Sequence, residues 1–219
     1  MNLLLRAAAC CAASLWLAGC APFSSASYQT LRLAVLGPPS QVTTDYVNTL
    51  HRPALVVRLN QSEALLLLAS RRDTQAEWHG VEQHLVTRNG KLVHTAGLPL
   101  EADLIVALGA DDPFAGDLRR LADGTTVTRL VDYPARYLTS VPQHARYTLG
   151  PSEAMTIMGQ SVELQRVDEA VSMPALGFTA SNRYWFDPAS GRVLASAQQI
   201  APGLPELFLT EAVPAGVAP

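Results

Sequence analysis

Three histidines lie close together in the sequence, and histidine is a common ligand of transition metals. His79 and His84 are five residues apart, His94 follows ten residues later, and Glu82 lies between the first two. A zinc site needs several such ligands at one point with tetrahedral geometry. This spacing matches no established metal motif. The sequence therefore predicts no metal site and no cofactor, and histidines that are exposed or satisfied by their neighbours.

Two pairs of adjacent acids, Asp111-Asp112 and Asp168-Glu169, are the candidates for carboxylate chemistry. Glycoside hydrolysis uses two carboxyl groups about 5–10 Å apart in space. Solvated charges in loops explain both pairs more simply, and the sequence has neither a G-x-S-x-G elbow nor a recognisable context for a Ser-His-Asp triad. We therefore predict no catalytic residue, with a periplasmic glycan-modifying enzyme as the alternative.

Aromatic side chains with polar neighbours are candidates for contacting a glycan or a protein partner. The candidates are Trp78, Asn182, Tyr184, Trp185 and Gln198. Packing in the core is the alternative for the aromatic residues, because aromatic side chains in strands commonly fill a sandwich. Three tyrosines that flank turns containing proline are a further candidate for a surface patch: Tyr133, Tyr137 and Tyr147.

The N-terminal segment indicates where the protein is attached. Arg6 is followed by an uncharged stretch from Ala7 to Gly19, which is shorter than the roughly 20 residues that span a bilayer. A basic start, a short apolar run and small residues before a cleavage point are typical of a secretory signal peptide. A buried N-terminal helix is the alternative.

The tetrapeptide LAGC, which ends at Cys20, resembles the bacterial lipobox. This resemblance implies that the Cys20 thiol receives a diacylglyceryl group, that the chain is cut before Cys20, and that the new amine is acylated, commonly with palmitate. The lipid bilayer is then a partner through the acylated cysteine. In the lipoprotein sorting pattern, a residue other than Asp after the cysteine favours the outer membrane, and here that residue is Ala21.

The cysteine count agrees with this processing. The chain has three cysteines, Cys10, Cys11 and Cys20. Cleavage removes two and lipidation blocks the third, so the mature chain holds no free thiol and no disulfide, as suits an oxidising periplasm. The net charge of −3 without a dense basic run gives no reason to expect nucleic-acid binding.

Turn signals divide the remaining chain into short strands. ALVVRL and ALLLLAS are separated by the polar NQSE and predict one hairpin, and the FDPASGRV segment predicts another with a four-residue loop. Asn89-Gly90 predicts a type I′ turn that pairs Arg88 with Lys91, Thr87 with Leu92 and Val86 with Val93. We expect the two like-charged side chains beside this turn to extend into solvent.

Helices are few in this pattern. TTDYVNTL predicts one or two helical turns with Thr43 or Thr44 as N-cap, and DDPFAGDLRRLADG predicts a helix that begins near Asp112 and stops by Gly124. Many short strands separated by turns predict a mainly β fold, an antiparallel sandwich or open barrel with a few short helices. The predicted organisation is a signal peptide (1–19), a tether (20–29), a β-rich domain (30–211) and a flexible tail (212–219).

Two long segments, EWHGVEQHLVTRNGKLVHTAGLP and NRYWFDPASGRVLASAQQIAPGLPELFL, together with the lipobox, resemble the YjbF/GfcB-like lipoproteins of group 4 capsule and exopolysaccharide systems. They bracket most of the mature chain, roughly Tyr28 to Glu211. The resemblance implies a non-catalytic accessory factor at the periplasmic face of the outer membrane, acting in assembly or export of an extracellular polysaccharide. Its implied partners are an outer-membrane β-barrel protein and polysaccharide. A general envelope-assembly lipoprotein remains an alternative.

Overall fold

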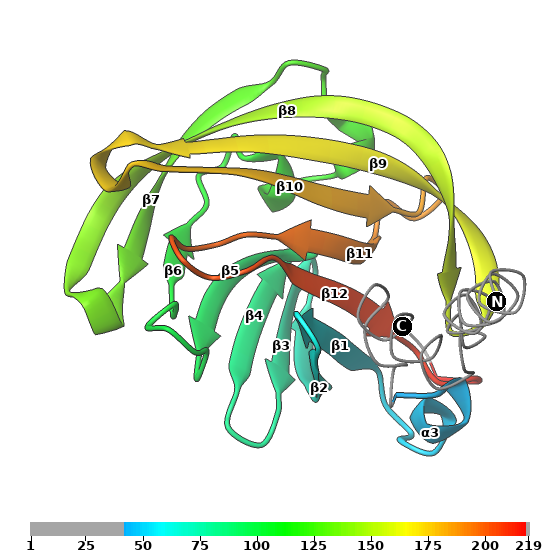
Figure 1. Cartoon of the computed structure of the whole chain (residues 1–219). Helices are drawn as coiled ribbons and strands as arrows, with labels where there is room; N and C mark the ends of the chain where they lie inside the picture. The colour runs from blue at the N-terminus through cyan, green and yellow to red at the C-terminus, as the bar shows by residue number, and fades with distance from the viewer. Residues whose placement is uncertain (1–41, 218–219) are drawn as a thin grey trace, which may run out of the picture. The chain divides into compact units, whose positions relative to one another are not determined.

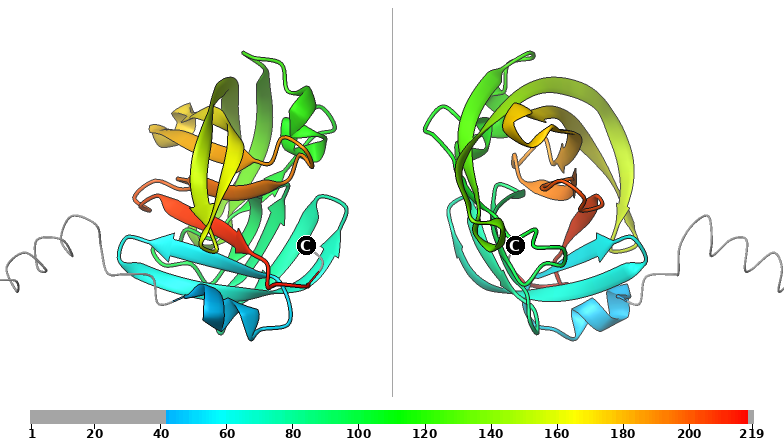
Figure 2. Two further views of the ribbon diagram at one scale, coloured as in Figure 1. Left: turned by 90° about the vertical axis from the view of Figure 1, so that its right-hand side faces the viewer. Right: turned by 60° about the vertical axis from the view of Figure 1, so that its left-hand side comes forward.

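The computed structural model describes residues 42–217, which form a closed antiparallel barrel of twelve strands (Figure 1). The predicted signal peptide, the tether and Cys20 lie outside the described residues, as does residue 218 onwards of the predicted tail. Figure 2 shows from two further sides how the strands curve around a common interior. Among residues 42–217, no helix has the length and apolar character that a membrane crossing requires.

The strands follow one another around the barrel in sequence order, and the last returns to the first. They are β1 (Ala54–Leu59), β2 (Ser62–Arg72), β3 (Gln75–His79), β4 (His84–Arg88), β5 (Lys91–Ala96), β6 (Ile105–Ala107), β7 (Thr126–Tyr133), β8 (Leu138–Ile157), β9 (Gln160–Met173), β10 (Phe178–Phe186), β11 (Val193–Gln198) and β12 (Leu207–Ala212).

Closure of the barrel corrects the predicted fold class. The mainly β fold and the hairpin between β1 and β2 are confirmed. The prediction of a sandwich or open barrel is wrong, because β1 pairs with both β2 and β12, so that Leu55 lies opposite Leu66 on one side and Glu211 on the other. A closed sheet leaves no edge strand with unpaired backbone groups. Local patterns define strands but carry no information on this long-range pairing.

The short helix predicted for TTDYVNTL is confirmed. Helix α3 (Thr44–Asn48) begins after Thr43, whose Oγ1 accepts a hydrogen bond from the Tyr46 backbone N–H at 3.2 Å. Its one buried residue, Val47, packs with Val56 of β1 and Ala212 of β12. The helix therefore lies against the pair of strands that closes the barrel (Figure 1).

The helix predicted from Asp112 to Gly124 is instead two short 3-10 helices, η1 (Pro113–Ala115) and η2 (Leu118–Arg120). The side chains of Asp112 and Asp117 each cap one of them. Gly116 lies between the two in an extended conformation, with φ −122 and ψ −150. This break prevents a continuous helix.

Two further 3-10 helices form corners of the barrel, η3 (Pro134–Arg136) between β7 and β8 and η4 (Pro174–Leu176) between β9 and β10. Each ends at a residue with left-handed backbone conformation, Tyr137 after η3 and Gly177 after η4. The inward-facing side chains fill the interior. The largest cluster of buried apolar residues includes Trp78, Leu85, Tyr133, Met173 and Leu209.

The Asn89-Gly90 turn joins β4 to β5 as predicted, with φ +46 and +80 at its two residues. The pairs Arg88–Lys91 and Thr87–Leu92 are confirmed. The third predicted pair is wrong, because Val86 lies opposite His94 and Val93 is the extra residue of a bulge. The predicted exposure of Lys91 is also wrong, since this side chain is buried.

Substitution of Gly90 by alanine is expected to destabilise the fold strongly. The left-handed φ alone costs an L-residue about 1–2 kcal/mol, and a Cβ at this position would lie 2.4 Å from Cγ1 of Val193. Gly203 has the same φ of +80, but a Cβ there would have no neighbour within 4 Å. Urea denaturation should therefore show a larger loss for Gly90→Ala than for Gly203→Ala. Equal losses would contradict close contact between the turn and Val193.

Candidate functional site

A carboxylate lies buried inside the barrel at the centre of a polar cluster. Glu169 of β9 has no exposed surface. Both of its carboxylate oxygens accept hydrogen bonds from the Lys91 ammonium at 2.9 Å, and Oε1 also accepts one from Nη1 of Arg129 at 2.6 Å. We call the charged group formed by Lys91, Arg129, Glu169 and Asp112 the ionic network.

Three uncharged side chains complete the shell around Glu169. The Tyr147 hydroxyl donates to Oε1 at 2.9 Å, and the Tyr184 hydroxyl and Asn182 Nδ2 donate to Oε2 at 2.8 and 2.9 Å. A buried carboxylate is stable only when its lone pairs are satisfied in this way. The shell therefore holds Glu169 in its ionised form.

Arg129 of β7 connects Glu169 to Asp112, which lies in the loop before β7. Its Nε donates to Oδ2 of Asp112 at 2.9 Å, and its other donors reach Gln143 and Tyr147. The second oxygen of Asp112 accepts from the Phe114 backbone and caps η1. With two cations and two anions, the network is neutral overall. The prediction that Asp112 and Glu169 are solvated loop charges is therefore wrong.

Burial controls the protonation of the network. Desolvation, together with the positive charge of Arg129, lowers the pKa of Lys91 to about 8. Desolvation by itself would raise the pKa of Glu169, but the charges of Lys91 and Arg129 outweigh it and hold that pKa below its ordinary 4.5. Burial and the charge of Glu169 raise the pKa of Tyr184. A general acid needs a carboxyl pKa raised towards the working pH, and Glu169 has the opposite shift.

The lowered pKa of Glu169 predicts a contribution to acid sensitivity. Because the unfolded state binds more protons below pH 4.5, the stabilisation by this carboxylate is fully present above that pH and is lost as the pH falls. The free energy of unfolding should therefore differ less between wild type and Glu169→Gln at about pH 3 than at about pH 6. Urea titrations at both pH values measure this. Glu206→Gln, at a half-exposed surface pair with Arg183, is the control. A constant difference would contradict the shift.

The structure brings three of the predicted contact residues together. Asn182 and Tyr184 bind Glu169, and Gln198 lies beside Tyr184. Gln198 also accepts from the Leu92 backbone at 3.0 Å and donates to the Gly90 carbonyl at 2.8 Å. All three are buried, and they use their polar groups within the protein. Their part in glycan or partner contact stays a prediction.

The two tryptophans lie apart. Trp78 is 1% exposed in the main core and donates from Nε1 to Thr87 Oγ1 at 2.9 Å. Trp185 belongs to another apolar cluster and donates to Glu153 at 2.8 Å. The predicted tyrosine patch is wrong: Tyr133 and Tyr147 are buried, and Tyr137 is 93% exposed.

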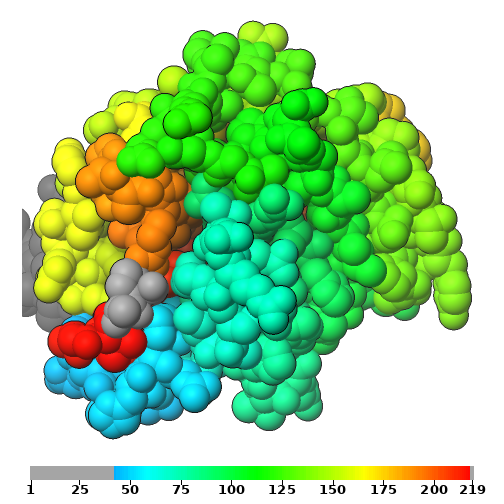
Figure 3. Space-filling view, turned by 180° about the vertical axis from the view of Figure 1, so that it is seen from behind, coloured from blue at the N-terminus to red at the C-terminus, as the bar shows by residue number. Residues whose placement is uncertain are grey.

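A cavity of about 550 Å³ opens between the turn after β2, the η1–η2 segment and the loop between β10 and β11. Figure 3 shows the surface hollowed where these teal, green and orange segments meet. Of the five predicted contact residues, Trp78 lines this cavity. The charged lining residues are Arg71, Asp73, Asp117, Arg119, Arg192 and Glu211.

Arginines and carboxylates share the charged wall of the cavity. Glu211 accepts from Nη2 of Arg71 at 2.5 Å and from Nη2 of Arg192 at 2.7 Å. The Arg71 guanidinium also lies 5.5 Å from the centre of the Trp78 ring. Guanidinium and carboxylate groups beside an aromatic ring can hold a polar ligand through directed hydrogen bonds. Sequence reasoning missed these arginines because they come from separate strands and loops that only the closed barrel brings together.

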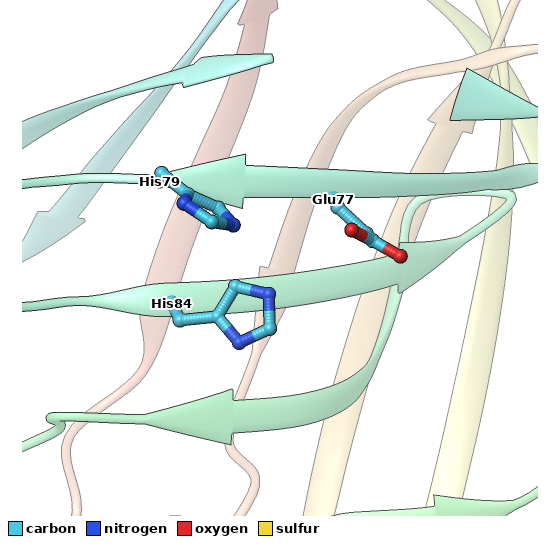
Figure 4. Close-up of side chains that lie close together, drawn as sticks. All are labelled: Glu77, His79 and His84. Carbon is cyan, nitrogen blue, oxygen red and sulfur yellow. The ribbon is translucent and has the colours of Figure 1, made fainter. Parts of the chain in front are cut away.

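The spacing of His79 and His84 in the sequence predicted no metal site. In the structure, however, their side chains lie close together. Figure 4 shows Glu77, His79 and His84 side by side on β3 and β4. Their potential ligand atoms all lie within 4.8 Å of one another. Glu82 is not part of this group. Glu77 carried no signal in the sequence beyond its position two residues before His79.

Comparison with known proteins places the chain. The family model described as "Group 4 capsule polysaccharide lipoprotein gfcB, YjbF" matches residues 28–211. The uncharacterized lipoprotein GfcB of Escherichia coli (strain K12) is 25% identical over 206 residues, which cover 92% of this chain and 95% of that protein. The crystal structure of the hypothetical lipoprotein YmcC from Escherichia coli K12 superposes with a TM-score of 0.68 at 24% identity, over 89% of this chain and 98% of that one. The chain belongs to the YjbF/GfcB family of group 4 capsule polysaccharide lipoproteins.

Proposed function

We propose that this protein is anchored to the periplasmic face of the outer membrane through acylated Cys20 and is a non-catalytic accessory factor in assembly or export of an extracellular or capsular polysaccharide. The family match over residues 28–211 is the observation that carries the proposal. The lipobox sequence before Cys20 supports the anchor, and Ala21 after it supports the outer membrane.

The cavity is the proposed contact point with polysaccharide. It is the larger of the two cavities described, and it combines arginines, carboxylates and the wall formed by Trp78. The second, of about 480 Å³, is a shallower stretch of β7, β8 and β9 that includes His144. Sugars present hydroxyl and carboxylate groups that match charged, hydrogen-bonding side chains. The larger cavity therefore fits a polar glycan better.

A non-catalytic role is supported by the state of the buried acids. Asp112 and Glu169 are each ion-paired to Arg129, and Glu169 is also paired to Lys91. Hydrolysis by paired carboxyls needs one acid with a raised pKa. Glu169 has a lowered pKa, which disfavours the protonated form that such an acid needs.

Gene deletion with complementation tests the proposal. In a producing strain, deletion should reduce extracellular polysaccharide, and wild-type protein should restore it. Cys20→Ala should fail to restore it because the protein is no longer anchored. The double variant Arg71→Gln/Arg192→Gln should restore it only partly, because it removes both donors to Glu211 in the cavity wall.

Controls separate this role from the alternatives. Arg183→Gln removes a half-exposed arginine outside the cavity and should restore polysaccharide fully. Unchanged polysaccharide in the deletion strain would overturn the proposal. New reducing ends released from purified polysaccharide would favour the glycan-modifying enzyme instead. A general loss of outer-membrane proteins would favour the envelope-assembly role. Crosslinking and pull-down from solubilised outer membranes would identify the β-barrel partner.

A further inference from the structure

We propose that Glu77, His79 and His84 form a zinc-binding site on the outer face of the barrel. The site is separate from the cavity and from the ionic network, and it does not depend on the proposed role in polysaccharide export. Its ligands would be one carboxylate and two imidazoles, a set that zinc uses in proteins.

Strand register brings the ligands together. His79 of β3 pairs directly with His84 of β4, because the intervening loop closes with a hydrogen bond from Gly80 N to Gln83 O at 2.8 Å. Glu77 is two residues before His79 and so lies on the same face of the sheet. Trp78 between them is in the core, which fixes the opposite, outward face for the two ligands of β3.

The distances suit a small cation. The potential ligand atoms lie within 4.8 Å of one another. Two ligands of a tetrahedral zinc ion, at about 2.1 Å from the metal, are about 3.4 Å apart. His79 is exposed and the other two are partly so, which leaves their side chains room to rotate and close this gap (Figure 4). Rotation of side chains is enough, and the strands stay in place.

The donor groups are free to bind. Throughout residues 42–217, no hydrogen bond or ion pair to the protein engages the side chains of Glu77, His79 or His84. A carboxylate beside two imidazoles, none of them in a hydrogen bond or ion pair within the described residues, is the arrangement that a cation would complete.

A third histidine extends the row. His94 of β5 lies opposite Val86, and its ring centre is 5.5 Å from that of His84. The His79 and His84 ring centres are 4.7 Å apart. Three histidines thus lie on three adjacent strands, and His94 is a further donor beside the proposed site.

Titration with Zn²⁺ tests the site. The detergent-solubilised, full-length lipidated protein, purified without a histidine tag, should bind one equivalent in competition with a chromogenic chelator. His84→Ala and Glu77→Gln should each weaken binding by about tenfold or more. Zn²⁺ should also raise the thermal midpoint of the wild type, because a ligand of the folded state stabilises it, and should not do so in His84→Ala.

A matched control keeps the test specific. His144 lies exposed on β8, with Thr128 as its partner, outside this cluster. His144→Ala should bind Zn²⁺ as the wild type does. With Co²⁺, the wild type and His144→Ala should give the visible absorption of a low-coordinate site, and His84→Ala should lose it. Absence of stoichiometric Zn²⁺ binding, or equal binding by wild type and His84→Ala, would overturn the proposal.

Discussion

Replacement of Glu169 by glutamine is expected to lower the free energy of unfolding by about 3–5 kcal/mol, because it leaves two buried cations without their shared anion. The side chains of Lys91 and Arg129 are 5% and 1% exposed, so water cannot take the place of the carboxylate. Small domains are stable by about 5–15 kcal/mol, so the loss is a large share of the total. Urea denaturation at neutral pH measures it.

A double-mutant cycle assigns the loss to the charge. Lys91→Met removes one of the two cations that Glu169 neutralises. In Lys91→Met/Glu169→Gln, Arg129 keeps Asp112 as its counter-ion, and the network is again balanced. The double variant should therefore lose less than the sum of the single variants. Glu206→Gln at the surface should change stability by about 0–1 kcal/mol. A loss for Glu169→Gln no larger than this control would contradict a structural role of the network.

Lys91 offers an independent measure of the same network. It is the only lysine in the sequence. An amine-reactive reagent should therefore label the folded protein slowly at this position, because the side chain is buried against Glu169. Labelling should become faster in Glu169→Gln, in which local opening exposes Lys91 more often. Rapid labelling of the folded wild type would contradict the burial.

The features predicted correctly from the sequence are those that depend on neighbouring residues. The Asn89-Gly90 turn forms because its two residues tolerate positive φ, and Thr43 caps α3 because its side chain reaches a free backbone N–H. The loop between β10 and β11 closes with Gly191 at φ +77, as its turn residues predict. Barrel closure depends instead on the pairing of β1 with β12, which no local signal specifies.

The sequence does contain a signal for the ionic network, which is the position of its charged residues within alternating strands. In β7, Arg129 is two residues from both Val127 and Val131, so its side chain points to the same inward face of the strand. Glu169 of β9 stands in the same way between Val167 and Val171. A charged residue at an apolar position of an alternating strand indicates a buried partner of opposite sign. Which partner it meets depends on closure of the barrel.

Only the part of the candidate site that depends on local strand pairing could be predicted from the sequence. Tyr184 lies opposite Ser196 across the hairpin of β10 and β11, and Gln198 is two residues further along β11 on the same face, so the proximity of Tyr184 and Gln198 follows from local pairing. Lys91 is 93 residues before Tyr184 in the sequence. Its position beside Tyr184 could therefore not be predicted. The arginines of the cavity are dispersed in the same way. Long-range closure is thus what separates the predicted features from those that only the structure shows.

Truncation of Trp78 is the other substitution with a large expected effect. Trp78→Ala should lower the free energy of unfolding by about 3–5 kcal/mol, because it opens a cavity in the main core. Trp185→Ala should cost less, because that ring lies in a smaller cluster and is 6% exposed. Trp78→Phe keeps most of the ring and loses the hydrogen bond to Thr87, so about 1–2 kcal/mol is expected. Urea denaturation of the three variants checks this order.

The comparison also separates two roles of Trp78, as a core residue and as a wall of the cavity. Its ring packs in the core and lies beneath the Arg71 guanidinium, so truncation alters both places at once. Trp78→Phe retains a ring face for Arg71 at a small loss of stability. If Trp78 acts by shaping the cavity, Trp78→Phe should restore polysaccharide in the deletion strain and Trp78→Ala should not, even at a temperature where both are folded. If Trp78→Ala restores it once folded, its role is packing alone, and the arginines carry the contact.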